Sequence, residues 1–196
     1  MAELKKIGIF GGSFDPVHRG HLTLARLAKK QLGLDAVYFV AAKYPPHKPG
    51  LALAPSKDRL NMLKLCLGAR ERISRFEIER PGTTYTWQTL KHFRKRFAKA
   101  GLFFILGGDS LCEIGSWKKP EVISKLCTIA AGVREGQKFV APVVFKGAIV
   151  KLRGKIPNVS STEIRHRIIL RKPVNKLVEG PVAKYITKHH LYENIE

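Results

Sequence analysis

The chain has 196 residues, 44% of them hydrophobic, and its 36 Lys and Arg against 15 Asp and Glu give a formal net charge of +21. This length suits one folded domain over residues 1–196, because such a chain buries roughly 70% of its unfolded surface in a single core. The hydrophobic fraction excludes an intrinsically disordered chain. No apolar run approaches the roughly 18 to 20 residues that cross a bilayer, and we find no secretory leader. We therefore expect a cytoplasmic protein.

The spacing of the cysteines and the distribution of the basic residues limit the ligands to be expected. The three cysteines, Cys66, Cys112 and Cys127, lack C-x-x-C spacing, so we expect buried reduced thiols and neither a disulfide framework nor a zinc site. Basic residues are spread along the chain without a block of five or more like charges, which excludes a basic tail. Their excess predicts a positive surface potential that favours phosphorylated small molecules, nucleic acid or an anionic membrane surface.

Strand-like and helix-like segments alternate along the chain. Short apolar runs predict strands at residues 7–10, 36–41, 73–78, 102–106 and 128–131, with weaker candidates at 140–145 and 148–152. Apolar positions at helical spacing predict helices at residues 22–32, 57–67, 87–97, 162–170 and 181–189. Ser56 and Thr86 are the expected caps of the second and third helices. The alternation implies an α/β fold: a single Rossmann-like parallel sheet with helices on both faces and ligands beyond the carboxyl ends of its strands.

The loop after the first predicted strand reads GGSFDPVHRGH over residues 11–21. Gly11 and Gly12 allow a ligand to approach the backbone closely, and their N–H groups can point at phosphate oxygens. His18 and His21 are three residues apart at a helix start, where anions are favoured, so both can donate hydrogen bonds to a phosphate. The alternatives are a simple turn with core histidines, or a metal pair. The concentration of these residues within one loop favours phosphate chemistry.

A second anion site is predicted at the start of the helix near residue 160. Ser160 and Glu163 fit the capping box S-x-x-E, and the alternative is that they form only a cap. Ser161, Thr162 and Arg165 add two hydroxyls and a cation to the same helix start.

A third region combines Tyr85-Thr86-Trp87 with residues 107–110 and Trp117. If the strand order reverses, the strands that end at Phe10 and Leu106 are neighbours, and residues 107–110 then face the glycine-histidine loop. Trp117 can stack on a flat heterocycle, and the alternative is ordinary core packing.

These motifs resemble a known family. GGSFDPVHRGH is similar to the G-G-[ST]-F-D-P-x-H-x-G-H signature of the nucleotidyltransferase superfamily, and residues 160–165, SSTEIR, are similar to its second signature, I-S-S-T-x-I-R. With PPHK at 45–48, the Tyr-Thr pair, GGDS at 107–110 and Trp117 in order, nearly the whole chain resembles bacterial nicotinate-nucleotide adenylyltransferases. The resemblance implies transfer of AMP from ATP to nicotinate mononucleotide in NAD biosynthesis, which gives deamido-NAD and pyrophosphate, with Mg²⁺ accompanying ATP.

The resemblance also implies residue roles, with in-line attack of the mononucleotide phosphate on the ATP α-phosphate. This nucleophile is already an anion, so positioning and charge stabilisation suffice. The implied catalytic residues are His18, His21 and Arg165. The implied ATP site comprises Gly11, Gly12, Ser13, His18, His21, Gly107, Asp109, Ser161, Thr162 and Arg165. The implied mononucleotide site comprises Lys48, Tyr85, Thr86, Trp117 and Arg134. We expect no metal site built from protein side chains.

Three positions depart from the family pattern: Ser13 stands where Thr is commoner, Lys118 follows Trp117 where an aromatic residue is frequent, and Glu135 follows Arg134 where Pro is frequent. We expect Lys118, or a neighbouring backbone N–H, to favour the carboxylate of nicotinate over the amide of nicotinamide.

Two other functions stay open. One is a different adenylyl- or cytidylyltransferase of the superfamily, such as the phosphopantetheine enzyme. The other is a non-catalytic nucleic-acid-binding module, which would gather its charge on one surface and carry a binding motif. We expect ATP and nicotinate mononucleotide as ligands, without nucleic acid or membrane, and a homo-oligomer is compatible with the sequence.

Overall fold

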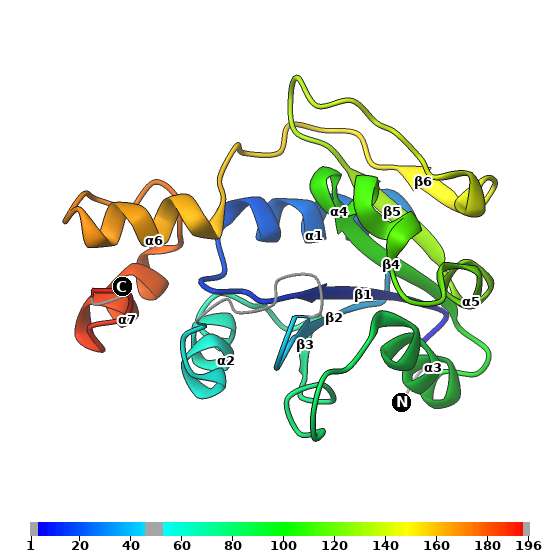
Figure 1. The fold of residues 1–196 in the computed structure, drawn as a ribbon, viewed down its shortest axis with the longest axis horizontal. Coiled ribbons are helices and arrows are strands. Elements are labelled where there is room, and N and C mark those ends of the chain that lie inside the picture. The colour runs from blue at the N-terminus through cyan, green and yellow to red at the C-terminus, as the bar shows by residue number, and fades with distance from the viewer. Residues whose placement is uncertain (1–3, 46–52, 194–196) are drawn as a thin grey trace.

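The computed structural model describes residues 4–45 and 53–193, and a six-stranded parallel sheet lies at its centre (Figure 1). The strands are β1 (Lys6–Gly12), β2 (Ala36–Ala41), β3 (Glu71–Ser74), β4 (Gly101–Gly107), β5 (Thr128–Gly132) and β6 (Ile149–Lys151). Their order across the sheet is β3-β2-β1-β4-β5-β6, and every neighbouring pair is parallel. The predicted Rossmann-like α/β sheet is therefore confirmed.

The strand order reverses at β1, which lies between β2 and β4. Phe10 of β1 is opposite Phe39 of β2, and Ile9 of β1 is opposite Phe104 of β4. Chain connections leave β1 and β4 in opposite directions, so an opening forms beyond the carboxyl ends of these two strands. The glycine-rich ends of β1 and β4 both border this opening, which confirms their predicted juxtaposition.

Helices cover both faces of the sheet, with α1 on one side and α3 on the other (Figure 1). The helices are α1 (Arg19–Leu32), α2 (Ser56–Lys64), α3 (Thr86–Arg96), α4 (Gly108–Glu113), α5 (Pro120–Leu126), α6 (Ser161–Ile169) and α7 (Gly180–Lys188). One core cluster joins the sheet to α1, α2, α6 and α7, and a second joins it to α3, α4 and α5. Alternate residues of the fully buried strand β2 enter the two clusters, because successive side chains of a strand point to opposite faces.

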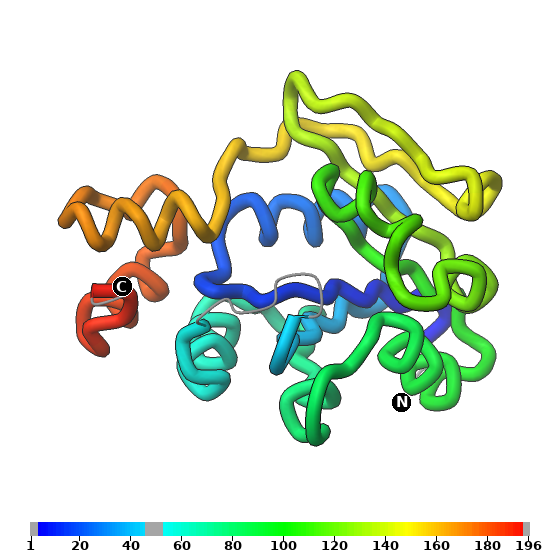
Figure 2. The backbone as a smooth tube through the Cα atoms, viewed as in Figure 1, coloured from blue at the N-terminus to red at the C-terminus, as the bar shows by residue number. Residues whose placement is uncertain are grey.

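The C-terminal part of the chain returns to the site end of the sheet. Figure 2 shows the backbone after β6 running back to place α6 and α7 near α2. The hydroxyl of Tyr185 in α7 donates to Asp58 Oδ1 (2.8 Å) and accepts from Asn61 Nδ2 (2.9 Å), both in α2. These contacts help to hold α6, and with it residues 160–165, beside the loop that follows β1.

The strand predicted at residues 140–145 is wrong. Val143 is 87% exposed, and residues Val143–Phe145 form a short 3₁₀ helix, η2, from which Phe145 enters the core. The composition of this segment is typical of a strand, but Pro142 cannot donate to a sheet ladder.

Other differences concern boundaries and short elements. The strand predicted at 73–78 is limited to β3, because the chain turns after Ser74. Ser56 and Thr86 are the first residues of α2 and α3, and Pro55 and Tyr85 occupy the cap positions. The short helices α4 and α5 were not predicted, since six and seven residues show no clear helical period. All three cysteines are free thiols, but of the three only Cys127 is buried as predicted: Cys66 is half-buried and Cys112 is exposed. Within residues 4–45 and 53–193, no helix is long and apolar enough to cross a membrane.

Candidate active site

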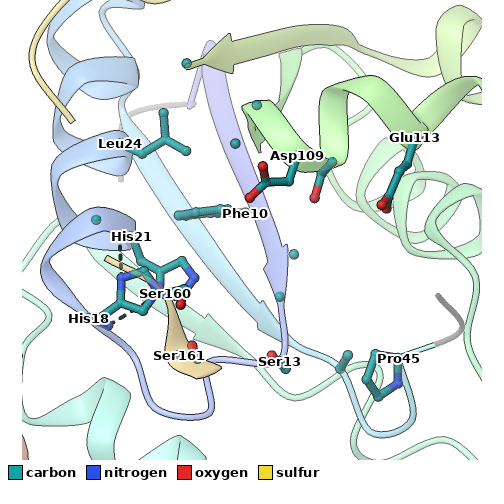
Figure 3. A pocket seen from close by; sticks show the side chains of 18 of the residues that line it. Phe10, Ser13, His18, His21, Leu24, Pro45, Asp109, Glu113, Ser160 and Ser161 are labelled. Carbon is teal, nitrogen blue, oxygen red and sulfur yellow. Dashed lines mark hydrogen bonds between the residues drawn. The ribbon is translucent and has the colours of Figure 1, made fainter. Parts of the chain in front are cut away.

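A cavity of about 410 Å³ lies beyond the carboxyl ends of β1 and β4 (Figure 3). Its walls come from the β1–α1 loop, the segment before α3, the start of α4, the end of β5 and the start of α6. Most of the predicted site residues line it: Gly11, Gly12, Ser13, His18, His21, Thr86, Gly107, Asp109, Trp117, Arg134, Ser161, Thr162 and Arg165. Residues predicted from three separate segments thus share one cavity.

The two histidines at the start of α1 hold each other in place. The backbone N–H of His21 donates to Nδ1 of His18 (3.4 Å), and the backbone N–H of His18 donates to Nδ1 of His21 (3.3 Å). Their rings stack with centroids 3.6 Å apart, next to Ser160 of the neighbouring wall (Figure 3). Because each Nδ1 accepts a hydrogen bond, the proton of each neutral ring lies on Nε2. Both rings therefore offer an Nε2–H donor.

His18 is uncharged at neutral pH. Burial lowers its pKa to about 3, and the guanidinium of Arg134 acts in the same direction. The sign follows from desolvation, which disfavours the imidazolium form. His18 is thus a neutral hydrogen-bond donor, and a proton held on a neutral imidazole is not readily released to a leaving group.

The second predicted motif forms the wall beside the histidines. Nη1 of Arg165 donates to the carbonyl oxygen of Asp15 (2.8 Å), and Nη2 donates to Oγ1 of Thr162 (3.3 Å). Oγ of Ser161 donates to the carbonyl oxygen of Pro16 (3.0 Å), 145 residues away in the sequence. Hydrogen bonds thus join the two sequence motifs directly.

The helix start of this motif follows the prediction in part. The Ser160 hydroxyl accepts from the backbone N–H of Glu163 (3.0 Å), which confirms the cap. The Glu163 carboxylate instead pairs with Nε of Arg167 (3.0 Å) on the next turn.

Asp15, in the first motif, is fully buried. Its Oδ1 accepts from the hydroxyl of Tyr192 (2.8 Å) and from the backbone N–H of Ala54 (3.2 Å), while its Oδ2 lies 3.8 Å from Nη1 of Arg165. Burial raises the pKa of Asp15, and the hydrogen bond from Tyr192 and the charge of Arg165 oppose this rise. Asp15 thereby ties the C-terminal segment to the glycine-histidine loop.

Arg59 of α2 holds the same loop by hydrogen bonds to backbone carbonyl oxygens. The side chain is 1% exposed, and its guanidinium donates to the carbonyl oxygens of Ser13 (2.8 Å), Ala42 (2.8 Å) and Ala54 (3.0 Å). No sequence pattern marked Arg59, because its role depends on backbone carbonyls from three different segments.

The wall formed by Trp117, the segment before α3 and the start of α3 carries aromatic and hydroxyl groups and one carboxyl group. Trp117 packs edge-on against Phe104 of β4, with ring centroids 6.2 Å apart at 73°. Glu77, Thr84 and Thr89, which the sequence did not single out, line the cavity together with Thr86. Oγ1 of Thr89 donates to Oε1 of Glu77 (2.6 Å), and burial raises the pKa of Glu77 to about 7.

Asp109 and Arg134 meet near the cavity opening. Nη2 of Arg134 lies 3.6 Å from Oδ2 of Asp109, and Nη1 of Arg134 donates to Asn158 Oδ1 (3.2 Å). Gln137 donates from Nε2 to Oδ1 of Asp109 (2.9 Å) and accepts the backbone N–H of Arg134 at Oε1 (3.0 Å). The two residues assigned to different ligands therefore belong to one network.

Comparison with known proteins agrees with this geometry. Residues 9–167 match the cytidylyltransferase-like family. A probable nicotinate-nucleotide adenylyltransferase of Thermus thermophilus is 40% identical over 188 residues, which cover 95% of this chain and 99% of that protein. Another, from Neisseria meningitidis, is 39% identical over 202 residues, which cover 97% and 100%. The chain belongs to the cytidylyltransferase-like family and, within it, to the nicotinate-nucleotide adenylyltransferases.

Solved structures agree on the fold of the family. Nicotinic acid mononucleotide adenylyltransferase of Plasmodium falciparum, complexed with NaAD, has a TM-score of 0.81 at 22% identity, and the match covers 98% of this chain and 100% of that chain. A putative nicotinate-nucleotide adenylyltransferase of Vibrio parahaemolyticus has a TM-score of 0.73 at 17% identity, with 98% of both chains covered.

Two residues predicted to contact the mononucleotide lie outside the cavity lining, and a third is not among the described residues. Lys48 lies outside the described residues. Tyr85 caps α3, with its backbone N–H donating to Oε1 of Gln88 (2.9 Å), and does not line the cavity. Nζ of Lys118 lies 4.4 Å from the centroid of the Tyr85 ring, and Lys118 does not line the cavity either. The ammonium of Lys118 is therefore engaged with an aromatic ring outside the cavity.

Among the described residues, three carboxylate residues line the cavity: Glu77 before α3, and Asp109 and Glu113 in α4. Figure 3 shows Asp109 and Glu113 across the opening from the histidines. In the part of the chain that the structure describes, no group of three or more His, Cys, Asp or Glu side chains is arranged to hold a metal ion.

Proposed function

We propose that this chain transfers AMP from ATP to nicotinate mononucleotide, releasing pyrophosphate and forming deamido-NAD in NAD biosynthesis. The observation that carries the proposal is the joining of the two motifs at one cavity, with Nε2–H donors on one wall and Arg165 on the next. The names shared by relatives that match over their full length support the choice of substrates.

The proposed reaction is a single in-line displacement. A phosphate oxygen of the mononucleotide forms a bond to the α-phosphorus of ATP, and the bond from that phosphorus to the bridging oxygen breaks, so that pyrophosphate leaves with the electron pair. The attacking oxygen is already anionic and needs no general base. Catalysis then rests on positioning, worth up to roughly 7 to 11 kcal/mol, and on electrostatic stabilisation.

The residues on the histidine side act on phosphate in this proposal. His18 and His21 donate from Nε2 to the α-phosphoryl group, where negative charge develops. Arg165 offers a fixed cation because the Asp15 carbonyl orients its guanidinium. The other proposed phosphate and nucleotide contacts of ATP are Gly11, Gly12, Ser13, Gly107, Asp109, Ser161 and Thr162. Removing one preorganised donor from such a site typically costs about 2.7 to 4 kcal/mol of transition-state stabilisation.

The residues on the opposite side hold the pyridine nucleotide. Trp117 stacks on the ring and Thr86 contacts its substituent, while Arg134 and Lys48 are the other proposed contacts of the mononucleotide. Trp117 and Thr86 line the cavity with Phe104 and Thr84, and this mixed apolar and hydroxyl surface supports an aromatic ring with one polar substituent.

Mg²⁺ bound to ATP fits the carboxylates that are present. Mg²⁺ takes most of its ligands from phosphates and water and needs only one or two carboxylates. Asp109 or Glu113 would supply one, and the ion would neutralise charge on the departing pyrophosphate. In this structure the two oxygens of Asp109 are engaged by Nη2 of Arg134 and Nε2 of Gln137, so a contact with the ion would replace one of them.

We further propose that residues 1–196 act as one domain in the cytoplasm, with small nucleotides as ligands. The single sheet shared by both core clusters, with helices from α1 to α7 packed on it, supports this view.

The test is release of pyrophosphate from ATP and Mg²⁺ with nicotinate mononucleotide, nicotinamide mononucleotide or phosphopantetheine in parallel. We expect the highest kcat/KM with nicotinate mononucleotide, and one dinucleotide, identified by mass, per pyrophosphate. Turnover with phosphopantetheine alone would contradict the proposal, as would pyrophosphate release that needs no acceptor.

A further inference from the structure

A buried carboxyl group lies in the cavity wall before α3, and phosphate transfer does not use it. Glu77, in the segment between β3 and α3, is 8% exposed and lines the cavity. The hydroxyl of Thr89, in the second turn of α3, donates to its Oε1 (2.6 Å). This bond fixes the carboxyl group against the helix and leaves Oε2 for another partner.

A second buried polar group lines the same wall. Thr84 is 4% exposed, and its Oγ1 has no hydrogen-bond partner among the residues that the structure describes. A buried hydroxyl without a partner is unfavourable, because its desolvation is not compensated. Because Oγ1 of Thr84 is itself enclosed, the group on this wall that can meet a ligand is Glu77, through Oε2.

Charged groups surround this wall without pairing to Glu77. They are Asp109 and Glu113, which line the cavity; His92 and Arg80, which stack on Phe76 next to Glu77 in the sequence; and Arg75, Glu79, Lys43, Lys91 and Lys118. Arg75 and Glu79 pair with each other at the surface (2.9 Å), and Nζ of Lys43 donates to the carbonyl oxygen of Arg80. Within residues 4–45 and 53–193, Glu77 makes no ion pair. Burial therefore dominates and raises the pKa of Glu77 to about 7, while the bond from Thr89 acts against it.

We propose that Glu77, held by Thr89 in the cavity wall, is a specificity-determining residue that contacts the pyridine substituent through Oε2. This inference rests on the proposed function. When it is neutral, Glu77 can donate its O–H to the carboxylate of nicotinate. Once ionised, Glu77 repels that carboxylate and accepts an N–H of the nicotinamide amide instead. The preference between the two mononucleotides therefore depends on one proton at Glu77.

The ratio of kcat/KM for nicotinate mononucleotide to kcat/KM for nicotinamide mononucleotide, measured from about pH 6 to pH 9, tests this inference. Titration of the phosphate, of ATP and of groups that act equally on both substrates cancels in this ratio. We expect the wild-type ratio to fall by about tenfold as Glu77 ionises. In Glu77→Gln, a neutral isostere, the ratio should change by less than about twofold over the same range. A pH-independent wild-type ratio would overturn the inference, as would an unchanged profile in Glu77→Gln.

Two further variants separate titration of Glu77 from a general effect on the loop. Thr89→Val removes the hydrogen bond that lowers the pKa of Glu77, so the midpoint of the ratio profile should move to higher pH. Glu79→Gln changes an exposed carboxylate of the same segment, and its profile should match the wild type. A shift in Glu79→Gln equal to that in Glu77→Gln would contradict the assignment.

Two measurements do not need turnover. The urea midpoint of the wild type should fall relative to Glu77→Gln between about pH 5 and pH 8, because unfolding lets Glu77 ionise. Quenching of tryptophan fluorescence gives the binding ratio of the two mononucleotides at each pH. A flat binding ratio overturns the inference even if AMP transfer occurs. A pH-dependent ratio that Glu77→Gln abolishes, without turnover of either mononucleotide, supports the inference and contradicts the proposed function alone.

Discussion

The two sides of the cavity are built on different principles. On the wall that we propose binds phosphate (the phosphate side), the rings of His18 and His21 each accept a hydrogen bond from the other's backbone N–H, and the Asp15 carbonyl fixes Arg165. On the wall that we propose binds the pyridine (the pyridine side), Glu77 is held by one hydrogen bond from Thr89, and burial raises its pKa to about 7. Phosphate transfer needs donors whose position and charge do not change, whereas choice between a carboxylate and an amide needs a group that responds to charge.

Substituting Arg59 tests how much the hydrogen bonds of its guanidinium contribute to the stability of the phosphate side. Arg59→Met leaves the carbonyl oxygens of Ser13, Ala42 and Ala54 without their donors, in a buried setting. We expect a loss of about 3 to 5 kcal/mol in the free energy of unfolding, measured with urea. Lys57→Met, on the exposed side of the same helix, should stay within about 0.5 kcal/mol of the wild type. Equal effects of the two substitutions would mean that Arg59 does not support this loop.

Shortening Trp117 should affect the pyridine side alone. Loss of a stacked indole costs about 1 to 3 kcal/mol per base, so Trp117→Ala should raise KM for nicotinate mononucleotide at least about fivefold. KM for ATP should change by less than about twofold, and Trp117→Phe should recover part of the loss. Trp87→Phe, outside the cavity lining, serves as the matched control. A larger rise in KM for ATP than for the mononucleotide would assign Trp117 to the wrong nucleotide.

His18 should stay neutral over the working pH range, so activity should show no change from its titration. Since the pKa of His18 is lowered to about 3, its ring should keep the neutral Nε2–H form from about pH 5 to pH 8 in ¹⁵N NMR spectra. The unfolded chain takes up a proton at this residue below about pH 6.5, so the free energy of unfolding should fall as pH decreases from there. Protonation of the folded ring near pH 6.5 would show that the donor is not held in its neutral form.

Sequence patterns located the parts of the molecule that local composition determines. The continuous apolar run 102–106 predicted β4 correctly, because a strand buried on both faces has no polar alternation. The strand predicted at 140–145 is wrong because the segment contains Pro142 and contributes only Phe145 to the core. Short helices such as α4 gave no periodic signal.

Long-range contacts determine the rest of the site. Tyr192 bonds Asp15 across 177 residues, and Arg59 bonds carbonyl oxygens of three segments, so neither role has a local signature. Glu77 is an ordinary polar residue in the sequence, and its raised pKa comes from burial by the fold. The motif histidines were recognisable, but their reciprocal backbone bonds, which set the Nε2–H tautomer, required the structure.

The central claim is that phosphate transfer and pyridine selection belong to separate sides of one cavity. The most direct test is kcat/KM of His18→Ala for nicotinate and nicotinamide mononucleotides. Loss of a preorganised donor should lower kcat about 100- to 1,000-fold for both substrates, and the ratio of the two kcat/KM values should stay within about twofold of the wild type. A ratio that shifts as far as it does in Glu77→Gln, or a change confined to KM, would contradict the account.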